Sequence, residues 1–524
     1  MAQIITGLNL SRPNTLVPLI AFGIYCVYYL ASHISSRWRA SQFGHRHGCK
    51  PPVSYPHIDP VLGLDVFYLS TKALNRGHLM DEFDRHFKTT AGGVYTFSGV
   101  LLGDKIIHTI EPENVKAVFA TNFKDYSLAP GRMRWFGIFG PGIFANNGHN
   151  WEESRALMRP NFVRSQVGDI ELLEVHVSHL LEKLLKEDEQ GVVDLQPLFH
   201  MLTMDWSTAM LLGESVHSLL GNDNTQLAQF CQWFDYVSLQ LAIRSRLGKL
   251  GALLPSRKFN EGVRAIWEFA ESFVDRALAA KAEGSRNGKP AAGSEQYDNK
   301  SRYVFLNEII NSGYNKTRIV SELLHILVAG RDTTASLLSV YFYTIVRHPD
   351  VFQRLHQEIL QEVGATPPSY EQLKDLKYLS WTLKEVHRLY PIIPLNSRIS
   401  ISDTVLPLGG GKDGKSPLFV RKGTRVVHYP YSMHRRKDIY GPDAEEFRPE
   451  RWNKLRTSWE YLPFSGGPRV CIGQSMAITA ASYTIVRVLQ TFKNISPGDE
   501  SVWAEKMIIT MSVRDGCHVR LAST

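Results

Sequence analysis

The stretch FSGGPRVCIG, residues 464–473, decides the interpretation of this chain. Its glycines and proline favour a tight loop, and an apolar, alanine-rich helical pattern follows directly. A cysteine at the start of a helix meets unpaired backbone amides and the positive end of the helix dipole. Both effects lower the pKa of a thiol, so we expect Cys471 to ionise and to act as a metal ligand or a nucleophile. For an isolated cysteine, a buried structural thiol is the ordinary alternative.

The composition is that of a large globular chain. It has 524 residues with a formal net charge of +8, and 44% of the residues are hydrophobic. A charge this small and diffuse gives no support to nucleic-acid binding, so no nucleic-acid partner is expected. The five cysteines are few, odd in number and widely spaced. We therefore expect no disulfide framework and assign the main part of the chain to a reducing compartment.

An uncharged N-terminal run predicts a membrane anchor. No Asp, Glu, Lys or Arg lies between Arg12 and Arg37, and a helix over about residues 13–36 is long enough to span a bilayer. A cleaved signal peptide is the alternative, but its apolar region is usually shorter. Basic residues follow the run at once, so the positive-inside rule places the following domain in the cytosol. Residues 1–50 are thus predicted as an anchor with a basic linker, and residues 51–524 as one domain.

Helical patterns dominate that domain. Short β-like patches near residues 93–109 and after residue 391 predict minor sheets, so the expected fold class is mainly α with minor β-sheets. The polar stretch 282–300 is predicted as an exposed loop between helices. The apolar run 323–346 carries Arg331 and Asp332 near its middle, which argues against a second membrane span. It is predicted as a long buried helix.

Residues 409–416, GGGKDGKS, match the phosphate-loop pattern without its structural context. That pattern needs a strand before the loop and a helix after it, so that helix amides meet the phosphates. Here Pro407 precedes the glycines, Pro417 follows the serine, and the next run resembles a strand. We interpret the stretch as the turn of a β-hairpin.

Further motifs share the order and spacing of one family. They are AGRDTT at 329–334, EVHR at 385–388, FRPERW at 447–452, and Trp151 with Arg155 four residues later. Together with FSGGPRVCIG they resemble the cytochrome P450 family from about residue 50 to the end. The resemblance implies the fold of that family, a haem b cofactor and a haem-thiolate monooxygenase activity.

The resemblance also implies roles for individual residues. Cys471 would be the axial thiolate ligand of the haem iron, and Phe464 would belong to the same cofactor-binding loop. The haem propionates would be held by charge-assisted hydrogen bonds; the residues assigned to this are Arg469, Trp151, Arg155 and Arg398.

The central helix carries the expected catalytic residues. Asp332 and Thr333 would relay protons to bound dioxygen. The hydroxyl of Thr333 can bond the carbonyl of Ala329 and open the helix there; the alternative is that the threonines only bend it. A structural charge network of Glu385, Arg388 and Arg451 is implied behind the cysteine loop, where losing one partner would leave an unpaired buried charge.

The expected substrate is an apolar small molecule that reaches the enzyme from the membrane. Segments 133–147 and 230–243 are rich in aromatic and aliphatic residues, although ordinary core packing must explain many of them. The turn GGGKDGKSP and the stretch VAGRDTTASLLS are similar to the fungal membrane-bound branch that hydroxylates n-alkanes and fatty acids. This resemblance implies electrons from NADPH through NADPH–cytochrome P450 reductase, at the endoplasmic reticulum membrane.

This chain differs from some related enzymes at one position, and three other functions remain open for it. Related animal ω-hydroxylases carry a glutamate that can esterify haem where this chain has Ala329, so we expect non-covalent haem. Relatives of the fungal branch also serve as tailoring oxidases of polyketide or terpenoid pathways. A haem-thiolate isomerase or dehydratase needs no oxygen-activation threonine, so the intact motif argues against it. A haem-binding membrane protein without turnover is the non-enzymatic alternative.

Overall fold

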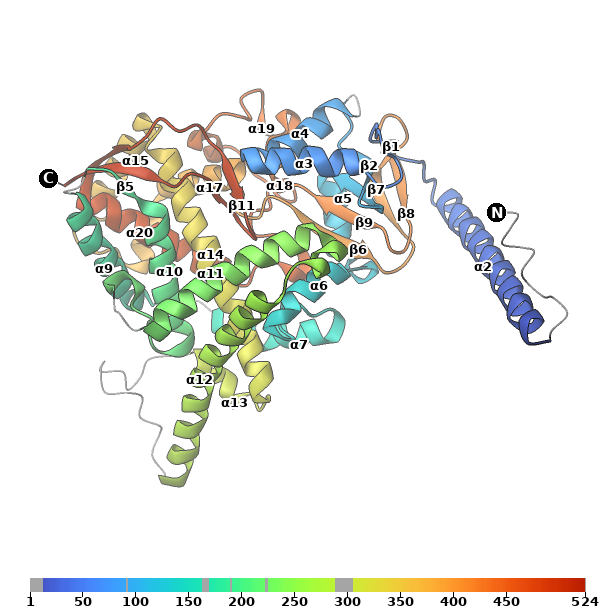
Figure 1. Ribbon diagram of the computed structural model, residues 1–524. Coiled ribbons are helices and arrows are strands. Elements are labelled where there is room, and N and C mark those ends of the chain that lie inside the picture. Colours follow the sequence, from blue (N-terminus) through green and yellow to red (C-terminus); the bar gives the residue numbers. More distant parts are fainter. Residues whose placement is uncertain are drawn as a thin grey trace.

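The structure is a computed structural model, and it describes residues 13–90, 93–162, 169–188, 191–221, 225–287 and 305–523. Most of its body is helical (Figure 1). The longer helices are α2 (Pro13–Arg46), α3 (Leu64–Arg76), α4 (Leu79–Thr89), α7 (Gly148–Met158), α9 (Ile170–Asp188), α10 (Leu195–Leu212), α11 (Thr225–Arg246), α12 (Arg257–Asn287), α14 (Lys316–Ile345), α15 (Pro349–Glu362), α17 (Lys377–Leu389) and α20 (Gln474–Thr491). The shorter ones are α5 (Pro112–Lys116), α6 (Pro130–Phe136), α13 (Phe305–Asn311), α16 (Tyr370–Asp375), α18 (Pro430–Met433) and α19 (Lys437–Tyr440).

The strands form small sheets beside the helices. A six-stranded mixed sheet has the order β1 (Val53–Ser54), β2 (Thr96–Leu101), β3 (Asp104–Thr109), β9 (Arg425–His428), β6 (Asn396–Ser400) and β4 (Tyr126–Ser127). A three-stranded sheet joins β10 (Phe492–Pro497), β13 (His518–Ser523) and β5 (Val193–Asp194). Two hairpins complete the strands, β7 (Thr404–Gly410) with β8 (Ser416–Val420), and β11 (Glu505–Met507) with β12 (Met511–Val513). The predicted fold class, mainly α with minor sheets, is confirmed, and so is the hairpin turn at residues 409–416.

Helix α14 is the central element of the core. It packs most extensively on α10 and also contacts α12, α17, α20 and β12. Its apolar side chains join two large clusters of buried residues, so the helix has no polar face toward solvent. The prediction of a long buried helix over residues 323–346 is confirmed.

Helix α2 extends away from the body (Figure 1). Its last turns lie on the β7–β8 hairpin, where Phe43 contacts Phe419 with ring centroids 5.7 Å apart. Among the side chains that the structure describes, no helix combines the length and apolar character needed to cross a membrane. Of the predicted span 13–36, the side chains of residues 13–20, 26, 33 and 36 lie outside the described set.

One boundary predicted from the sequence is wrong. The expected loop 282–300 begins inside a helix, because α12 continues to Asn287. The alanine-rich run before Gly284 has high helix propensity, and this outweighs the glycine in the last turns. The rest of that predicted loop, residues 288–300, lies outside the described residues.

Candidate functional site

The Cys471 loop lies immediately before helix α20. A short 3₁₀ turn at Gly467–Arg469 leads into it, and the backbone amide of Cys471 donates to the carbonyl of Phe464 at 3.0 Å. Gly467 has a φ of +69°, and a Cβ there would lie 1.9 Å from the carbonyl oxygen of Phe119. Only glycine fits this position, because both the backbone conformation and the close approach exclude a side chain.

The thiol of Cys471 is accessible, yet it lies deep among protein atoms. Desolvation raises its pKa, while the Gly473 backbone amide and the Arg155 charge act in the opposite direction without outweighing it. The predicted net lowering of the pKa is therefore wrong for the free thiol. A bound metal cation reverses this balance, because it deprotonates a coordinating thiol outright. The thiol is thus accessible to a ligand although protein atoms surround it, as an iron ligand requires.

Helix α14 has one accessible stripe in an otherwise buried stretch. From Ile319 to Ile345 every residue is buried except Ala329, Gly330 and Thr333. Thr333 lies four residues after Ala329 and three after Gly330, so it is one helical turn from both and shares their side of the helix. The hydroxyl of Thr333 donates to the carbonyl of Ala329 at 2.7 Å, which confirms the predicted bond. The two small residues and the threonine therefore leave this side of the helix partly accessible.

Asp332 lies beside this stripe but not on it. Its side chain is buried, and its Oδ1 accepts from Arg331 Nη1 at 2.9 Å. Burial is the largest influence on the Asp332 carboxyl and raises its pKa. The structure therefore brings Ala329, Gly330 and Thr333 together, and holds the Asp332 carboxylate in an ion pair behind them.

Four guanidinium groups gather near the Cys471 loop. Arg155 Nη1 donates to the carbonyl of Val470 at 2.9 Å. The guanidinium groups of Arg155 and Arg469 lie 5.9 and 4.2 Å from the ring centroid of Trp151, which is itself buried. Arg398 is also buried. The fourth member is Arg132, which no sequence motif marked.

These cations lack acidic partners within the described part of the chain. Arg132 and Arg398 both donate to the side-chain oxygen of Asn396, at 3.3 and 3.1 Å. Arg469 donates to the Asn146 carbonyl at 3.0 Å and to the Asn147 side chain at 3.2 Å. Burial and repulsion by Arg132 and Arg155 lower the pKa of Arg469 to about 9. Arg398 is buried and the other three arginines are half-buried. Charges withdrawn from water are normally paired in native proteins, so this cluster fits an anionic ligand.

The site fits a haem group. The accessible thiol of Cys471 supplies the donor for iron, and the arginine cluster supplies charge-assisted hydrogen bonds for two propionate carboxylates. The residues that would hold the group are Cys471, Arg132, Arg155, Arg398, Arg469 and Trp151. Phe464 supports the loop from behind, where its ring packs edge-on against His387 with centroids 5.1 Å apart.

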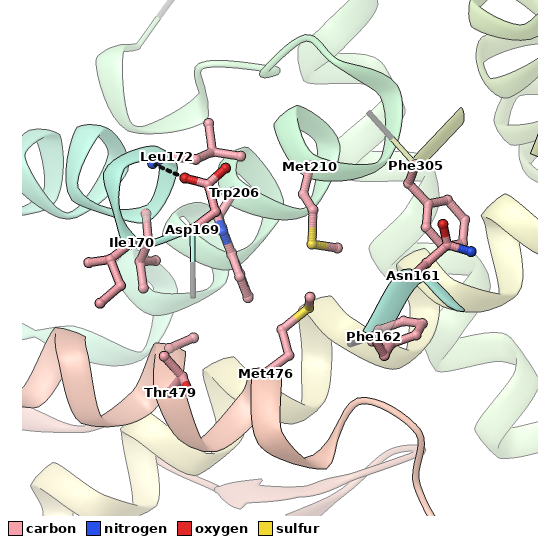
Figure 2. A pocket seen from close by; sticks show the side chains of 12 residues that line it. Asn161, Phe162, Asp169, Ile170, Leu172, Trp206, Met210, Phe305, Met476 and Thr479 are labelled. Carbon is pink, nitrogen blue, oxygen red and sulfur yellow. Dashed lines mark hydrogen bonds between the residues drawn. The ribbon is translucent and has the colours of Figure 1, made fainter. Parts of the chain in front are cut away.

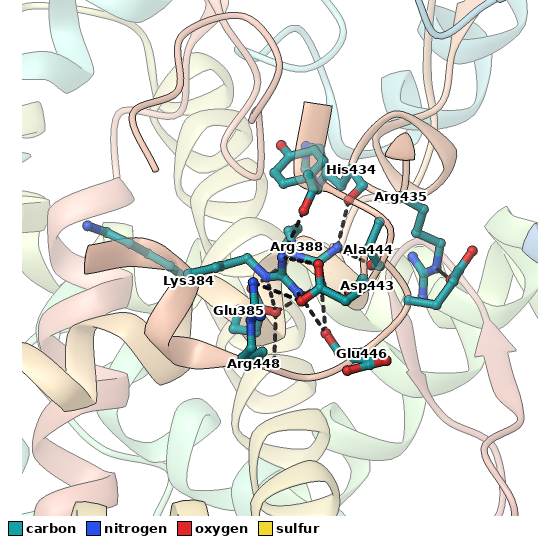
Figure 3. A network of polar contacts seen from close by, with 12 residues as sticks. Lys384, Glu385, Arg388, His434, Arg435, Asp443, Ala444, Glu446 and Arg448 are labelled. Atoms are coloured by element: carbon teal, nitrogen blue, oxygen red, sulfur yellow. Dashed lines mark hydrogen bonds and ion pairs between the residues drawn. The ribbon is translucent and has the colours of Figure 1, made fainter. Parts of the chain in front are cut away.

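The charge network behind the loop is as predicted (Figure 3). Glu385 and Arg388 on α17 are completely buried and form two hydrogen bonds of 2.8 and 2.9 Å. Arg451 Nε and Trp452 Nε1 donate to the same carboxylate at 2.8 and 2.9 Å. The remaining donors of Arg388 bind the carbonyl oxygens of His434, Ala444 and Glu446.

This network reaches the segment that leads into the cysteine loop. His434 Nε2 accepts from the backbone amide of Leu462 at 3.0 Å, and the hydroxyl of Tyr461 donates to the carbonyl of Lys384 at 3.0 Å. Residues 461 and 462 directly precede the loop. The network therefore fixes the loop's start, and its role is structural.

A small cavity beside α20 is separate from this site. It has a volume of about 30 Å³, enough for one or two water molecules, and is lined by residues such as Asn161, Trp206, Met210 and Met476 (Figure 2). None of the predicted site residues lines it. It is too small for the expected substrate.

Comparison with known proteins agrees with this geometry. The sequence model of the family "Cytochrome P450" matches residues 63–512. The "Cytochrome P450 monooxygenase himC" of Aspergillus japonicus is 42% identical over 479 residues, covering 90% of this chain and 84% of the relative. "Cytochrome P450 52E1" of Candida apicola is 39% identical over 469 residues, covering 86% of each. "Cytochrome P450 monooxygenase FPY7" of Fusarium mangiferae is 37% identical over 515 residues, covering 97% and 96%.

The chain belongs to the cytochrome P450 family. It is an oxidoreductase of the monooxygenase class, whose members bind haem iron through a cysteine thiolate and depend on a redox partner and a small-molecule substrate.

Proposed function

We propose that this chain inserts one oxygen atom of O₂ into an apolar, chain-like substrate such as a fatty acid or an alkane. The single observation that carries the proposal is the accessible stripe of Ala329, Gly330 and Thr333 on a buried helix, in a chain whose Cys471 thiol is also accessible. The resemblance to the n-alkane and fatty-acid hydroxylating branch supports the substrate class. The apolar residues Ile326 and Val328 of α14 lie within one turn of the stripe, which favours an apolar ligand.

Each site residue has a defined part in this proposal. Haem, when bound, would supply the activation of dioxygen, and Cys471 would hold its iron through the thiolate. The arginine cluster with Trp151 binds the propionates and orients the group. Thr333 holds a proton at its hydroxyl beside the space over the helix stripe, and Asp332 returns that proton from the protein interior. Net turnover consumes two electrons and two protons for each O₂ and releases one water.

Electron supply and location complete the proposal. Electrons come from NADPH through the membrane-bound NADPH–cytochrome P450 reductase, and the domain faces the cytosol at the endoplasmic reticulum membrane. Helix α2 supports this location, because it projects from the body and exposes large apolar side chains such as Phe22, Val27 and Leu30. The uncharged sequence between Arg12 and Arg37 is the second support.

Product analysis tests the substrate class. The full chain with reductase, NADPH and O₂ is expected to convert long-chain fatty acids or n-alkanes into products one oxygen atom heavier. Oxidation of a polyketide or terpenoid from a fungal metabolite extract, with no lipid product, would instead assign the chain to the tailoring oxidases. Absence of every oxygenated product would contradict the proposal.

The variant Thr333→Ala tests the proton relay. We expect NADPH consumption to continue while product per NADPH falls roughly tenfold, because general acid–base groups contribute 10²–10⁴-fold and water replaces part of this. Thr333→Ser keeps the hydroxyl and is the matched control. Equal product per NADPH in Thr333→Ala and the control would exclude the threonine from proton transfer.

A further inference from the structure

Arg331 is shared between two carboxylates on two helices. This buried residue of α14 binds Asp332 of its own helix through Nη1 at 2.9 Å. The same nitrogen also binds Oδ1 of Asp235, which lies on α11. The guanidinium stacks 5.4 Å from the ring centroid of Phe234. One cation therefore joins α11 to the helix that carries Thr333.

The two carboxylates differ in their surroundings. The side chain of Asp235 is 60% exposed, whereas that of Asp332 is only 12% exposed. The accessible carboxylate can exchange protons and ions with solvent, and the buried one cannot do so directly. The charge of Asp235 is therefore partly screened by solvent, and its influence on Asp332 depends on the salt concentration.

The other titratable groups around this pair are few among the described residues. His200 of α10 has Nδ1 3.7 Å from Asp332 Oδ1, too far for a hydrogen bond. Burial and the charges of Arg331 and Lys506, on β11, lower the pKa of His200 to about 3, so it is neutral near pH 7. Cys231 of α11 faces Arg331, and burial raises its thiol pKa to about 11. Beyond the effect of burial, the charges that act on Asp332 are those of Arg331 and Asp235.

We propose that Asp235 is a positioning residue for proton delivery: it shares the Arg331 cation and so keeps the Asp332 carboxyl available to take up and release a proton. The inference rests on the proposed role of Asp332 in the relay. In each delivery the neutral Asp332 carboxylic acid loses a proton toward Thr333 and becomes a carboxylate. A proton that enters from solvent by way of intervening groups then restores the acid. A carboxylate bound to Arg331 alone would hold its negative charge too firmly for this cycle.

Electrostatics gives the direction of the effect. Arg331 lowers the pKa of Asp332 and Asp235 raises it. Removing the charge of Asp235 therefore lowers the pKa of Asp332, and the acid form is lost at a lower pH. Because Asp235 is accessible, the expected change is modest, roughly 0.5–1 pH unit.

The test is the pH dependence of product formed per NADPH consumed by the full, haem-loaded chain with reductase. For Asp235→Asn we expect the alkaline fall in this ratio to move down by roughly 0.5–1 pH unit, equivalent to a threefold to tenfold loss on that limb. Asp235→Glu restores the charge and should restore the profile. The matched control is Glu261→Gln, an exposed acid on α12 that pairs with Arg257.

A second measurement uses the unaltered protein. Raising the salt concentration screens Asp235 and should move the alkaline limb of the wild type toward that of Asp235→Asn, while the variant itself moves less. An unchanged profile in Asp235→Asn, or one shared with Glu261→Gln, overturns the inference. The variant Asp332→Asn distinguishes failure of the relay from failure of the role of Asp235. If Asp332→Asn leaves product per NADPH intact, the proposed relay itself fails. If Asp332→Asn lowers this ratio while Asp235→Asn does not, only the role of Asp235 fails.

Discussion

At the scale of single residues, Gly467 shows how strictly the Cys471 loop is specified. We expect Gly467→Ala to lose most of its haem, because the new Cβ would overlap the Phe119 carbonyl and displace the loop. Gly423→Ala is the matched control, since Gly423 also has a positive φ of +87° but no atom within 4 Å of its would-be Cβ. Haem per protein, from absorbance of the purified variants, measures the effect. Equal haem content in both variants would contradict the account.

Ala329 gives a prediction about how haem is attached. The position offers no carboxylate to form an ester with the cofactor, so haem should be held by ligation, hydrogen bonds and packing only. Extraction of the denatured protein with acidified organic solvent is expected to release all haem. Haem that stays on the polypeptide would contradict this.

The residues of the site differ in how far the sequence could predict them. Motifs with fixed spacing contain Cys471, Arg469 and Trp151. The resemblance to the family therefore predicted that these residues lie near one another. Arg132 belongs to no motif. Only its half-buried, desolvated position without an acidic partner in the described chain reveals it. The pair of Asp235 and Arg331 is separated by 96 residues, and a contact of that kind depends on tertiary packing, which leaves no local pattern.

At the scale of elements, the β11–β12 hairpin connects two helices of the domain. At its start, the buried side chain of Glu505 accepts from the backbone amide of Met80 at 2.6 Å, at the first turn of α4. Near its turn, Thr510 forms a hydrogen bond of 3.2 Å with Ser336 on α14. The hairpin therefore holds α4 and the central helix α14 in fixed positions relative to each other.

Glu505 makes this connection sensitive to pH. Burial raises its pKa from 4.5 to about 7, so the folded state binds the proton more tightly than the unfolded state. The stabilisation is complete below about pH 4.5 and is lost as the pH rises through about 7. The full difference is about 3 kcal/mol. The unfolding free energy of the wild type should thus fall between pH 5 and pH 8.5.

The variant Glu505→Gln should remove most of that fall, because its amide stays neutral while its oxygen can still accept from Met80. Chemical denaturation at both pH values measures this, with the exposed Glu500→Gln as the control. A fall of equal size in Glu505→Gln and Glu500→Gln would show that another group is responsible.

Elements with a strong hydrophobic pattern were predictable from the sequence. Boundaries at which opposing local preferences nearly cancel were not. The alanine-rich run of α20 predicts a helix at nearly its observed bounds. The apolar run 323–346 predicts α14 and its end, but the observed helix begins earlier, at Lys316. The glycine turn between β7 and β8 was predictable because proline flanks it on both sides. The end of α12 was not, since propensity and a single glycine oppose each other there. The pKa of Cys471 also depended on burial, which no local pattern encodes.

At the scale of the whole molecule, the account predicts one domain attached to a bilayer by α2. Introducing two charges with Val27→Arg and Leu30→Arg should cost about 2.5–3.5 kcal/mol each at the bilayer centre. We expect this double variant to leave the membrane pellet after an alkaline carbonate wash that retains the wild type. The control is Leu220→Arg with Leu360→Arg, two accessible leucines elsewhere on the domain. Full retention of the α2 variant would refute the anchor.

The central claim is that the sulfur of Cys471 binds the haem iron. Its most direct measurement is the absorption spectrum of the reduced, carbon-monoxide-treated protein, compared between the wild type and Cys471→Ser. The account predicts the strongly red-shifted Soret band of a thiolate-ligated haem in the wild type and its loss in the variant. A red-shifted band that survives in Cys471→Ser would contradict it.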